Sequence, residues 1–375
     1  MRVLHVISTL SAGGPEHQLR LLVSRLPHES EVVTLSPPGA VAAALRAGGT
    51  TVHELSGRRD LATVGPLRRL IRRGRFDLVH THMRRASVPG RFAARLAGVP
   101  RVVATEHQLA GENGRLRDVL DSGHPATGHG ERRGRFHDQL YLAGERLGQV
   151  TIAASPAIAA QLQGWGVPES RIAVIPKAVD AGEFRFDPGL RATARARLGI
   201  APGAAVVGGV GRLEPTERFD RLIRAVGEVP GATLLLVGDG PARDALEKLA
   251  AIEGIADRVV FAGPVAHARE MLCAMDVFAS PSEETSGLVV LESLAAGLPA
   301  LYARCEPLGP RPTVEGVKRL TPHDRESLPR ALRAELLCCE ERQFHRLPPR
   351  TASSRYGADH LADEVARVYE QAGRR

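Results

Sequence analysis

Short apolar runs alternate with amphipathic segments along the first half of the chain. The apolar runs predict buried strands, and the segments between them carry apolar residues at helical spacing. A polar glycine loop at residues 8–15 separates the first strand from a helix with Leu19, Leu21, Leu22, Val23 and Leu26 as its apolar residues. The predicted strands are residues 2–8, 31–35, 50–54, 78–82, 101–105, 150–154 and 172–175, and the later helices are 39–48, 62–73, 88–97, 138–147 and 156–164.

The alternation resumes after a candidate linker at residues 176–182. Strands are predicted at 205–210, 232–237, 259–262, 277–279 and 299–302, and helices at 217–227, 242–253, 267–273 and 287–296. Beyond Ala303 the pattern weakens. A last amphipathic helix at about 358–372 places Leu361, Val365, Val368 and Tyr369 on one face.

Strands that alternate with helices predict a parallel sheet covered on both faces. Two such series predict an α/β protein with two doubly wound, Rossmann-like domains. We expect an N-terminal domain at residues 1–178, a second domain at 179–355, and a final helix at 356–375 that packs back on the first domain. Such sheets bind ligands at the carboxyl ends of their strands, and two of them face to face would form a cleft suited to small molecules.

Residues 109–137 interrupt the alternation. They are rich in Gly, Arg, His and Asp and have little apolar periodicity, so we expect a long loop, of a kind that is often functional. The loop contains His124, His129 and His137, whose spacing is not that of metal ligands, so we expect no metal site there.

The composition excludes several classes of protein. Hydrophobic residues make up 43% of the 375 residues and aromatic residues only 4%, which allows a sizeable core but argues against stacking platforms for single-stranded nucleic acid. The four cysteines, among them the adjacent Cys338 and Cys339, lack zinc or disulfide spacing. No apolar run approaches the roughly 20 residues of a membrane span, and the first run is too short for a signal peptide. We therefore expect a cytoplasmic protein.

The net charge of +8 is concentrated in the first half of the chain. Residues 1–150 hold 22 basic and 13 acidic residues (22 − 13 = +9), whereas the remainder holds 28 and 29 (28 − 29 = −1). Such a field can attract an anionic lipid surface or a phosphorylated acceptor, and it also fits a solvated helix face. Without base-reading motifs, the charge alone does not indicate a nucleic-acid partner. The densest group is Arg68, Arg69, Arg72, Arg73, Arg75, Arg84 and Arg85.

A pair of glutamates gives the most informative chemical signal. Glu284 follows a predicted strand, and Glu292 lies within the next predicted helix. The backbone N–H groups of residues 285–288, at the start of that helix, can bind a diphosphate. The two acids can accept hydrogen bonds from sugar and ribose hydroxyls. The spacing alone also fits a surface loop with two solvated glutamates.

The acid pair, with Gly287-Leu288 inside it and residues 295–299 behind it, resembles the donor-site signature of family 4 retaining glycosyltransferases, which have the GT-B fold. Other segments resemble that family in the same order, and the resemblance covers roughly residues 1–108 and 138–300. These segments are Gly13-Gly14-Pro15-Glu16, Thr105-Glu106-His107, residues 175–180, Gly211-Arg212-Leu213, residues 237–241, and Asp276-Val277 with Pro281-Ser282.

The resemblance implies catalytic roles for three residues. Arg212 would pair with the donor pyrophosphate, a role that suits the forked, permanent charge of arginine. Glu284 would hold sugar hydroxyls. His107 would contact the transferred sugar and support charge near its anomeric carbon, although a buried structural histidine remains the alternative.

The donor would also be bound through the glycine loop and the helix start. Glu292 would hold the ribose, and His80 and His82 fit an acceptor-side or structural role better than a catalytic one. The remaining donor contacts that the resemblance implies are Gly13, Gly14, Arg218, Thr285, Ser286, Gly287 and Leu288.

The sequence departs from the family pattern in four places. Glu217 stands where the family usually has a lysine, which reverses a charge beside the leaving diphosphate and could cost several kcal/mol in a dry site. Arg218 could compensate if the backbone shifts. The other departures are Lys177-Ala178 in place of Asn-Gly, Thr285-Ser286 in place of Gly-Phe, and no evident Gly-Gly-x-x-Glu loop in residues 301–314.

The resemblance implies a hexosyl- or N-acetylhexosaminyltransferase that retains the anomeric configuration. The acceptor hydroxyl attacks the face that the diphosphate leaves, and the departing phosphate takes the proton, so catalysis is positioning plus charge stabilisation. We expect a nucleotide-diphosphate sugar as co-substrate, UDP rather than GDP because UDP is commoner in the family, and no metal or other cofactor. The acceptor is open: a small polar metabolite, or a lipid-linked or anionic glycan, with possible peripheral membrane contact through the basic half.

Two other functions remain open. Glu217 is the feature that favours a catalytically impaired protein that binds a nucleotide sugar without turnover. A sugar-nucleotide epimerase or hydrolase on the same fold would instead consume the donor without an acceptor.

Overall fold

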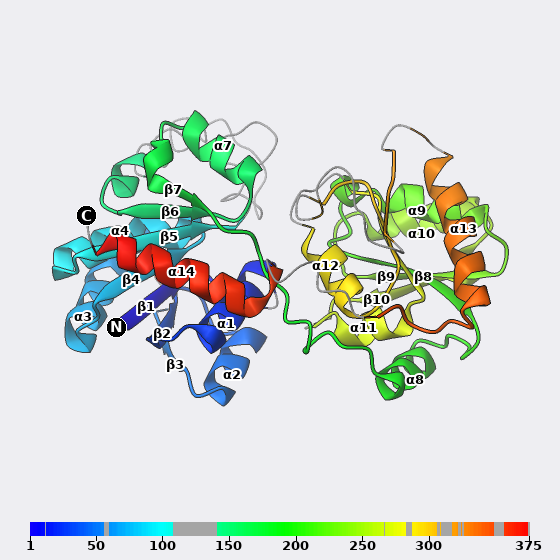
Figure 1. Ribbon diagram of the computed structural model, residues 1–375, viewed down its shortest axis with the longest axis horizontal. Helices are drawn as coiled ribbons and strands as arrows, with labels where there is room; N and C mark the ends of the chain where they lie inside the picture. Colours follow the sequence, from blue (N-terminus) through cyan, green and yellow to red (C-terminus); the bar gives the residue numbers. More distant parts are fainter. Residues whose placement is uncertain are drawn as a thin grey trace. The chain divides into compact units, whose positions relative to one another are not determined.

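The computed structural model describes residues 1–11, 13–55, 60–107, 141–265, 267–282, 287–305, 308, 317–321, 324, 326–348 and 356–373. These residues form two compact units. Unit 1 consists of Met1–Ala178 and Ala358–Arg375, and unit 2 of Val179–Gly357. Each unit contains one parallel sheet with helices packed on its faces (Figure 1).

The sheet of unit 1 has seven parallel strands in the order β3-β2-β1-β4-β5-β6-β7. The chain order reverses between β1 and β4, which makes the carboxyl ends of these two strands the expected ligand site. The strands are β1 (Arg2–Ile7), β2 (Glu29–Thr34), β3 (Thr51–Glu54), β4 (Leu78–His82), β5 (Arg101–Glu106), β6 (Val150–Ala153) and β7 (Ile172–Val174).

Helices cover both faces of this sheet. One face packs on α1, α2 and α14, and the other on α3 and α4, because successive side chains of each strand point to opposite faces. The helices are α1 (Gly14–Arg25), α2 (Ala40–Ala47), α3 (Val64–Gly74), α4 (Arg84–Ala97), α7 (Pro156–Gly164) and α14 (Ala358–Ala372), and residues 141–145 are also helical.

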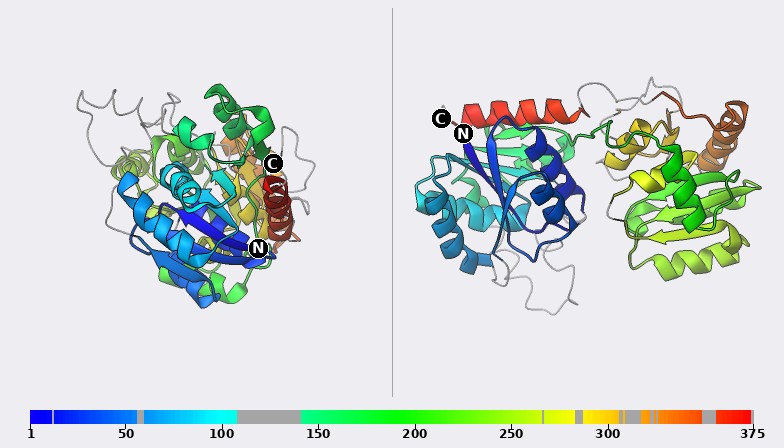
Figure 2. Two further views of the ribbon diagram at one scale, coloured as in Figure 1. Left: turned by 90° about the vertical axis from the view of Figure 1, so that its left-hand side faces the viewer. Right: turned by 90° about the horizontal axis from the view of Figure 1, so that it is seen from below.

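The C-terminal helix α14 belongs to unit 1, as predicted. It lies beside α1 and buries its apolar stripe against strands β1, β4 and β5 (Figures 1 and 2). The stripe is the one expected from the sequence, Leu361, Val365, Val368 and Tyr369. In the same unit, the side-chain amide of Gln18 on α1 donates to the carbonyl of Ala178 and accepts from its N–H. Gln18 thereby links α1 to Ala178, the last residue of the first of the two segments that form unit 1.

The sheet of unit 2 has six parallel strands in the order β10-β9-β8-β11-β12-β13, with the reversal between β8 and β11. Helices again cover it. The strands are β8 (Ala205–Val210), β9 (Ala232–Val237), β10 (Val259–Gly263), β11 (Val277–Ser280), β12 (Ala300–Tyr302) and β13 (Val317–Arg319). The helices are α8 (Pro188–Arg197), α9 (Phe219–Gly227), α10 (Arg243–Ile252), α11 (Arg269–Ala274), α12 (Leu288–Ala295) and α13 (Ser327–Glu341).

A buried ion-pair network holds α8 against the start of β11. The Asp276 carboxylate pairs with Arg191 at 2.7 Å and with Arg195 at 2.8 Å, and it accepts a hydrogen bond from the N–H of Val206. Arg195 is almost wholly buried and also donates to backbone carbonyls, so its charge is fully partnered. The network positions β8 and β11, the two strands that flank the reversal in strand order.

The elements differ from those expected from the sequence in three places. Helix α4 begins at Arg84 rather than at residue 88, because Pro89 is accommodated inside the helix and Met83, at φ 69°, precedes it. The weak pattern beyond Ala303 nevertheless contains β13 and α13. Helix α8, for which the sequence suggested no element, follows the linker. Within the described ranges, no helix is long and apolar enough to cross a membrane.

Candidate functional site

The glycine loop after β1 leads into α1 at the carboxyl edge of the first sheet. Gly13 precedes the helix with extended backbone angles, and Gly14 is the first helical residue. A Cβ on Gly13 would lie 2.3 Å from a carboxylate oxygen of Glu16, so a larger residue there would require the Glu16 side chain to move. Glu16 is buried, and burial raises the pKa of its carboxyl. The glycine loop is therefore packed against the carboxyl group of Glu16.

His107 directly follows β5 and is 7% exposed. Its Nε2 lies 3.3 Å from Nδ1 of His82, and its Nδ1 has no hydrogen-bond partner among the described residues. Burial and the nearby charge of Lys177 lower the pKa of His107 to about 3. His107 is therefore a neutral imidazole at physiological pH, with one nitrogen left to bind a ligand.

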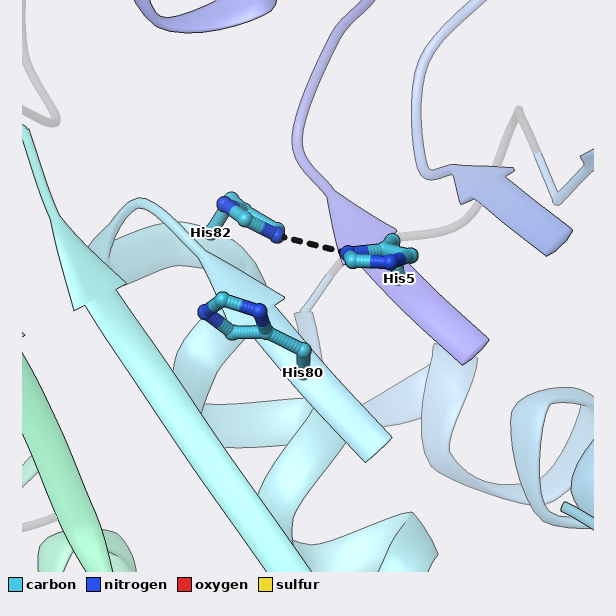
Figure 3. A group of neighbouring side chains, drawn as sticks. All are labelled: His5, His80 and His82. Atoms are coloured by element: carbon cyan, nitrogen blue, oxygen red, sulfur yellow. Dashed lines mark hydrogen bonds between the residues drawn. The ribbon is translucent and has the colours of Figure 1, made fainter. Parts of the chain in front are cut away.

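His107 belongs to a group of four buried histidines that the sequence analysis did not assemble. His5 lies on β1 in register with His80 on β4, and His82 ends β4 on the same face (Figure 3). His5 Nδ1 lies 3.1 Å from His82 Nε2, and this pair is drawn in Figure 3. All four rings are held neutral, because burial lowers the pKa of His5 to about 3 and those of His80 and His82 well below the usual value.

Three of these rings come close enough together to suggest a metal site. One nitrogen each from His5, His80 and His82 lies within 4.8 Å of the others. However, both nitrogens of His80 already lie 2.7 Å from hydroxyls, those of Tyr369 and Thr105. The rings of His80 and His82 also lie close together and are tilted, with centroids 4.0 Å apart and planes at 36°. Hydrogen bonding accounts for this arrangement better than metal ligation does.

A narrow cavity lies beside His107 within unit 1. Its volume is about 30 Å³, room for only a water molecule or two. His82, His107 and Lys177 line it together with Gln18 of α1 and the apolar face of α14. The cavity thus lies between the histidine group and the segment that follows β7.

The opposite face of β5 carries a second buried polar group. The Glu106 carboxylate accepts a hydrogen bond from the Tyr141 hydroxyl at 3.0 Å. Burial raises the pKa of Glu106, and the charges of Arg84 and Arg91 oppose that rise. Arg84 stacks on Trp165, with its guanidinium carbon 3.9 Å from the ring centroid. The sequence analysis did not predict this group, because nothing in the pattern pairs Glu106 with residues so distant in the chain.

Arg212 follows β8 at the carboxyl edge of the second sheet. Its side chain is 72% exposed, and its guanidinium pairs with Glu214 at 2.8 Å. Gly238, at φ 134°, ends the neighbouring strand β9, and a Cβ there would lie 1.9 Å from the carbonyl oxygen of Gly211. This close approach and the positive φ explain the glycine at position 238.

Glu217 also lies at this edge. A Cβ on Gly211 would be 3.1 Å from the carboxyl carbon of Glu217, so the acid side chain lies over the end of β8. Arg218 has left-handed backbone angles, φ 56° and ψ 32°, and pairs with Asp220 at 3.4 Å. The acid therefore faces the region where the resemblance implied a cation, and Arg218 is engaged elsewhere.

Helix α12 starts at the carboxyl end of β11, as predicted. Gly287 precedes it with φ 56°, and a Cβ there would lie 2.3 Å from Cys305 Sγ, so the turn requires glycine. Leu288 is the first helical residue, and Glu292 lies in the second turn, partly buried. Three predicted site residues, Glu284, Thr285 and Ser286, lie outside the described residues, as do the 109–137 loop and its histidines.

The predicted residues thus fall into two sets, one in each unit. Gly13, Gly14 and His107 follow β1 and β5 of unit 1, whereas Arg212, Arg218 and the start of α12 follow β8 and β11 of unit 2. Strands β1, β8 and β11 flank the reversals in strand order, where doubly wound sheets bind ligands, whereas β5 lies next to β4.

Models of two protein families match the chain. The one described as Glycosyltransferase Family 4 matches residues 13–183, and the one described as Glycosyl transferases group 1 matches residues 204–336. The first match includes Gly13, Gly14, His107 and the linker at residues 176–182, and the second includes Arg212, Gly287 and Glu292.

Among curated proteins, the D-inositol 3-phosphate glycosyltransferase of Actinosynnema mirum is 32% identical over 325 residues, covering 80% of this chain and 74% of that protein. The enzyme of the same name from Nocardia farcinica is 35% identical over 246 residues, covering 61% and 52%. The chain therefore spans about half the length of the latter relative.

Among solved structures, Anabaena Alr3699/HepE in complex with UDP is similar to the whole chain. The TM-score is 0.78 at 20% identity, covering 99% of this chain and all of that one. A structure of the same protein with UDP-glucose gives a TM-score of 0.74 at 21% identity, covering 100% of this chain and 98% of that one. This likeness supports the two-sheet fold.

Proposed function

Because the chain belongs to glycosyltransferase family 4, we propose that it transfers a hexosyl or N-acetylhexosaminyl group from a UDP-sugar to an acceptor hydroxyl with retention of configuration. One observation carries this proposal. The glycine loop, Arg212 and the start of α12 follow strands that flank a reversal in strand order, and His107 follows β5, one strand further along the sheet of unit 1. Two such sheets supply a phosphate-binding side and a sugar-binding side.

In this proposal, unit 2 binds the nucleotide and neutralises the leaving group. Arg212 contacts the diphosphate, and its exposed side chain can turn from Glu214 to a ligand with a higher charge. The N–H groups at the start of α12 add the positive end of the helix dipole. Glu292 accepts from the ribose hydroxyls and Glu284 from the sugar.

Unit 1 supplies His107 to the transferred sugar. Its pKa of about 3 keeps the ring uncharged, so it can hydrogen-bond the sugar without placing a second positive charge beside the anomeric carbon, where positive charge develops. The departing phosphate takes the acceptor proton in this scheme, so no carboxylate base is needed. Holding the acceptor hydroxyl on the face of the sugar that the diphosphate leaves supplies much of the rate enhancement.

We propose a phosphorylated polyol as the acceptor. The similar curated proteins are named for D-inositol 3-phosphate. In this chain, Lys177 lines the cavity beside His107, and residues 1–150 carry the excess of positive charge. A phosphate on the acceptor is attracted by such a field. No metal is needed in this scheme, because Arg212 and helix α12 carry the charge stabilisation.

An acceptor-dependent assay tests this proposal. The full chain is incubated with UDP-glucose, UDP-N-acetylglucosamine or GDP-mannose, with and without D-inositol 3-phosphate. We expect release of UDP, but not of GDP, only when the acceptor is present. Release of UDP at the same rate without acceptor would instead indicate a hydrolase, and conversion of the UDP-sugar without release of UDP would indicate an epimerase. Either result would contradict the transferase proposal.

A catalytically impaired nucleotide-sugar-binding protein is the second candidate, and one observation favours it. Both cations beside the end of β8 are paired with acids, Arg212 with Glu214 and Arg218 with Asp220, while Glu217 lies against Gly211. A carboxylate near the diphosphate opposes the charge that builds up on the leaving group.

Replacing Glu217 by lysine distinguishes impaired from full activity. We expect Glu217→Lys to raise kcat/KM for the UDP-sugar by about tenfold, because a cation replaces an anion beside the diphosphate and Arg218 is held by Asp220. Glu228→Lys, an exposed acid in the same unit, is the matched control and should change nothing. An unchanged kcat/KM for Glu217→Lys would show that the wild-type site already neutralises its leaving group.

A further inference from the structure

Three of the four buried histidines form a continuous chain that ends at His107. His5 Nδ1 lies 3.1 Å from His82 Nε2, and His82 Nδ1 lies 3.3 Å from His107 Nε2. The chain runs from the middle of β1, past the end of β4, to the end of β5. Figure 3 shows the His5–His82 link and His80 below it. His80 stands outside the chain, since its two nitrogens face Tyr369 and Thr105.

Neutral rings allow this chain only two arrangements. A neutral imidazole has one N–H donor and one bare nitrogen, so each ring donates at one side and accepts at the other. In the first arrangement His5 donates to His82, His82 donates to His107, and the proton of His107 is on Nδ1. In the second, every bond is reversed, and the proton of His5 is on Nε2.

The two ends of the histidine chain distinguish these arrangements. His5 Nε2 and His107 Nδ1 are the terminal nitrogens of the histidine chain. Neither has a hydrogen-bond partner among the residues that the structure describes. His5 is 0% exposed. The second arrangement leaves an N–H of His5 unsatisfied in the core, which is rarer in proteins than an unsatisfied acceptor. His107 Nδ1 is buried as well, but His107 is 7% exposed and lines the cavity, which His5 does not, so a water or sugar oxygen that enters there can accept from it.

We propose that His5, His82 and His107 form a hydrogen-bonded chain of the first kind, which fixes the proton of His107 on Nδ1. His107 then presents an N–H donor to an oxygen of the transferred sugar, and His82 and His5 are positioning residues for that contact. The sugar contact rests on the proposed function, whereas the direction of the chain does not.

Nitrogen-15 NMR of the full chain labelled at histidine tests the proposal directly. The imidazole shifts distinguish protonated from bare nitrogens, and substitution of single histidines assigns them. We expect the wild-type protein to carry its proton on Nδ1 of His5, His82 and His107, with couplings across both N–H···N links. A proton on Nε2 of His107 in the wild-type protein would overturn the proposal, whether or not any variant folds.

Removal of the middle ring provides a second test. Without the donor at His82, His107 should move its proton to Nε2, the nitrogen that a free histidine side chain prefers. We expect His82→Leu to show this shift together with a roughly tenfold lower kcat, the effect of one lost hydrogen bond. If the His107 proton stayed on Nδ1 in His82→Leu, the proposed hydrogen-bonded histidine chain would be contradicted.

Tyr369→Phe is the matched control. It removes the hydroxyl beside His80 in the same buried layer but leaves the three-ring chain intact. We expect the His107 tautomer and kcat to be unchanged. If the tautomers are as expected but no sugar is transferred, the proposed function is wrong and the proposed histidine chain stands. If sugar is transferred but the His107 proton is on Nε2, the proposed function stands and the proposed histidine chain is wrong.

Discussion

Replacing Arg212 by alanine should lower kcat/KM for the UDP-sugar by about 10²- to 10³-fold. The side chain lies beyond the end of β8, is 72% exposed and pairs at 2.8 Å with the partly exposed Glu214, a surface pair that a more highly charged diphosphate can displace. Its interaction strengthens as the leaving group gains charge, so we expect kcat to fall as well as KM to rise. Arg212→Lys should recover part of the loss, because a lysine keeps the charge but lacks the fork.

Arg197→Ala is the control for this variant. Arg197 is an exposed arginine of the same unit, paired with Glu270 on its surface, and its loss should leave kcat/KM unchanged. Steady-state kinetics with a coupled UDP assay measures both variants. If Arg212→Ala kept wild-type kcat and KM, the diphosphate would not bind at the end of β8, and the assignment of unit 2 as the donor-binding unit would be wrong.

Acidification should destabilise unit 1 strongly. The four buried histidines have folded pKa values lowered from 6.5, to about 3 for His5 and His107, so the unfolded chain binds more protons below pH 6.5. Their contribution is complete above pH 6.5 and is lost as the pH falls towards 3. Each histidine costs about 1.4 kcal/mol one pH unit below 6.5, so the four together should lower the free energy of unfolding by about 5 kcal/mol near pH 5.5. The raised pKa values of Glu16 and Glu106 offset part of this loss.

Urea unfolding at about pH 7.5 and about pH 5.5 measures this effect. The chain has one tryptophan, Trp165, and it lies in unit 1, so its fluorescence reports that unit. His5→Gln should remove about 1.4 kcal/mol of the pH-dependent loss, whereas His345→Gln, an exposed residue of unit 2, should not change it. An equal free energy of unfolding at the two pH values would mean that these rings are protonated in the folded state.

The alternation of strands and helices could be predicted because most elements bury an apolar stripe or run. Helix α8 could not, because its buried face is formed by Ala194 and by the ion-paired Arg195 rather than by large apolar residues. Strand β13 has only three residues, two of them exposed, so it has no period to detect. Helix α4 begins before Pro89, a residue that usually marks the first turn of a helix.

The strands that precede the described candidate site residues could also be predicted, whereas Glu284, Thr285 and Ser286 lie outside the described residues. The partners of the described site residues could not. His80 and His82 share a face in any strand, but the place of His5 beside His80 depends on β1 lying next to β4, which is set by strand order rather than by local pattern. The pairing of Arg218 with Asp220 likewise depends on a left-handed backbone at a residue that is not glycine, which no local rule indicates.

Proton NMR of the product tests the central claim most directly. The full chain is incubated with a UDP-sugar and D-inositol 3-phosphate, and the coupling constant of the new anomeric proton is measured. Because UDP-sugars of this kind are α-linked, retention predicts the small coupling of an α-glycoside joined to the acceptor. A β-glycoside, or free sugar with unchanged acceptor, would contradict the proposal that this chain is a retaining transferase.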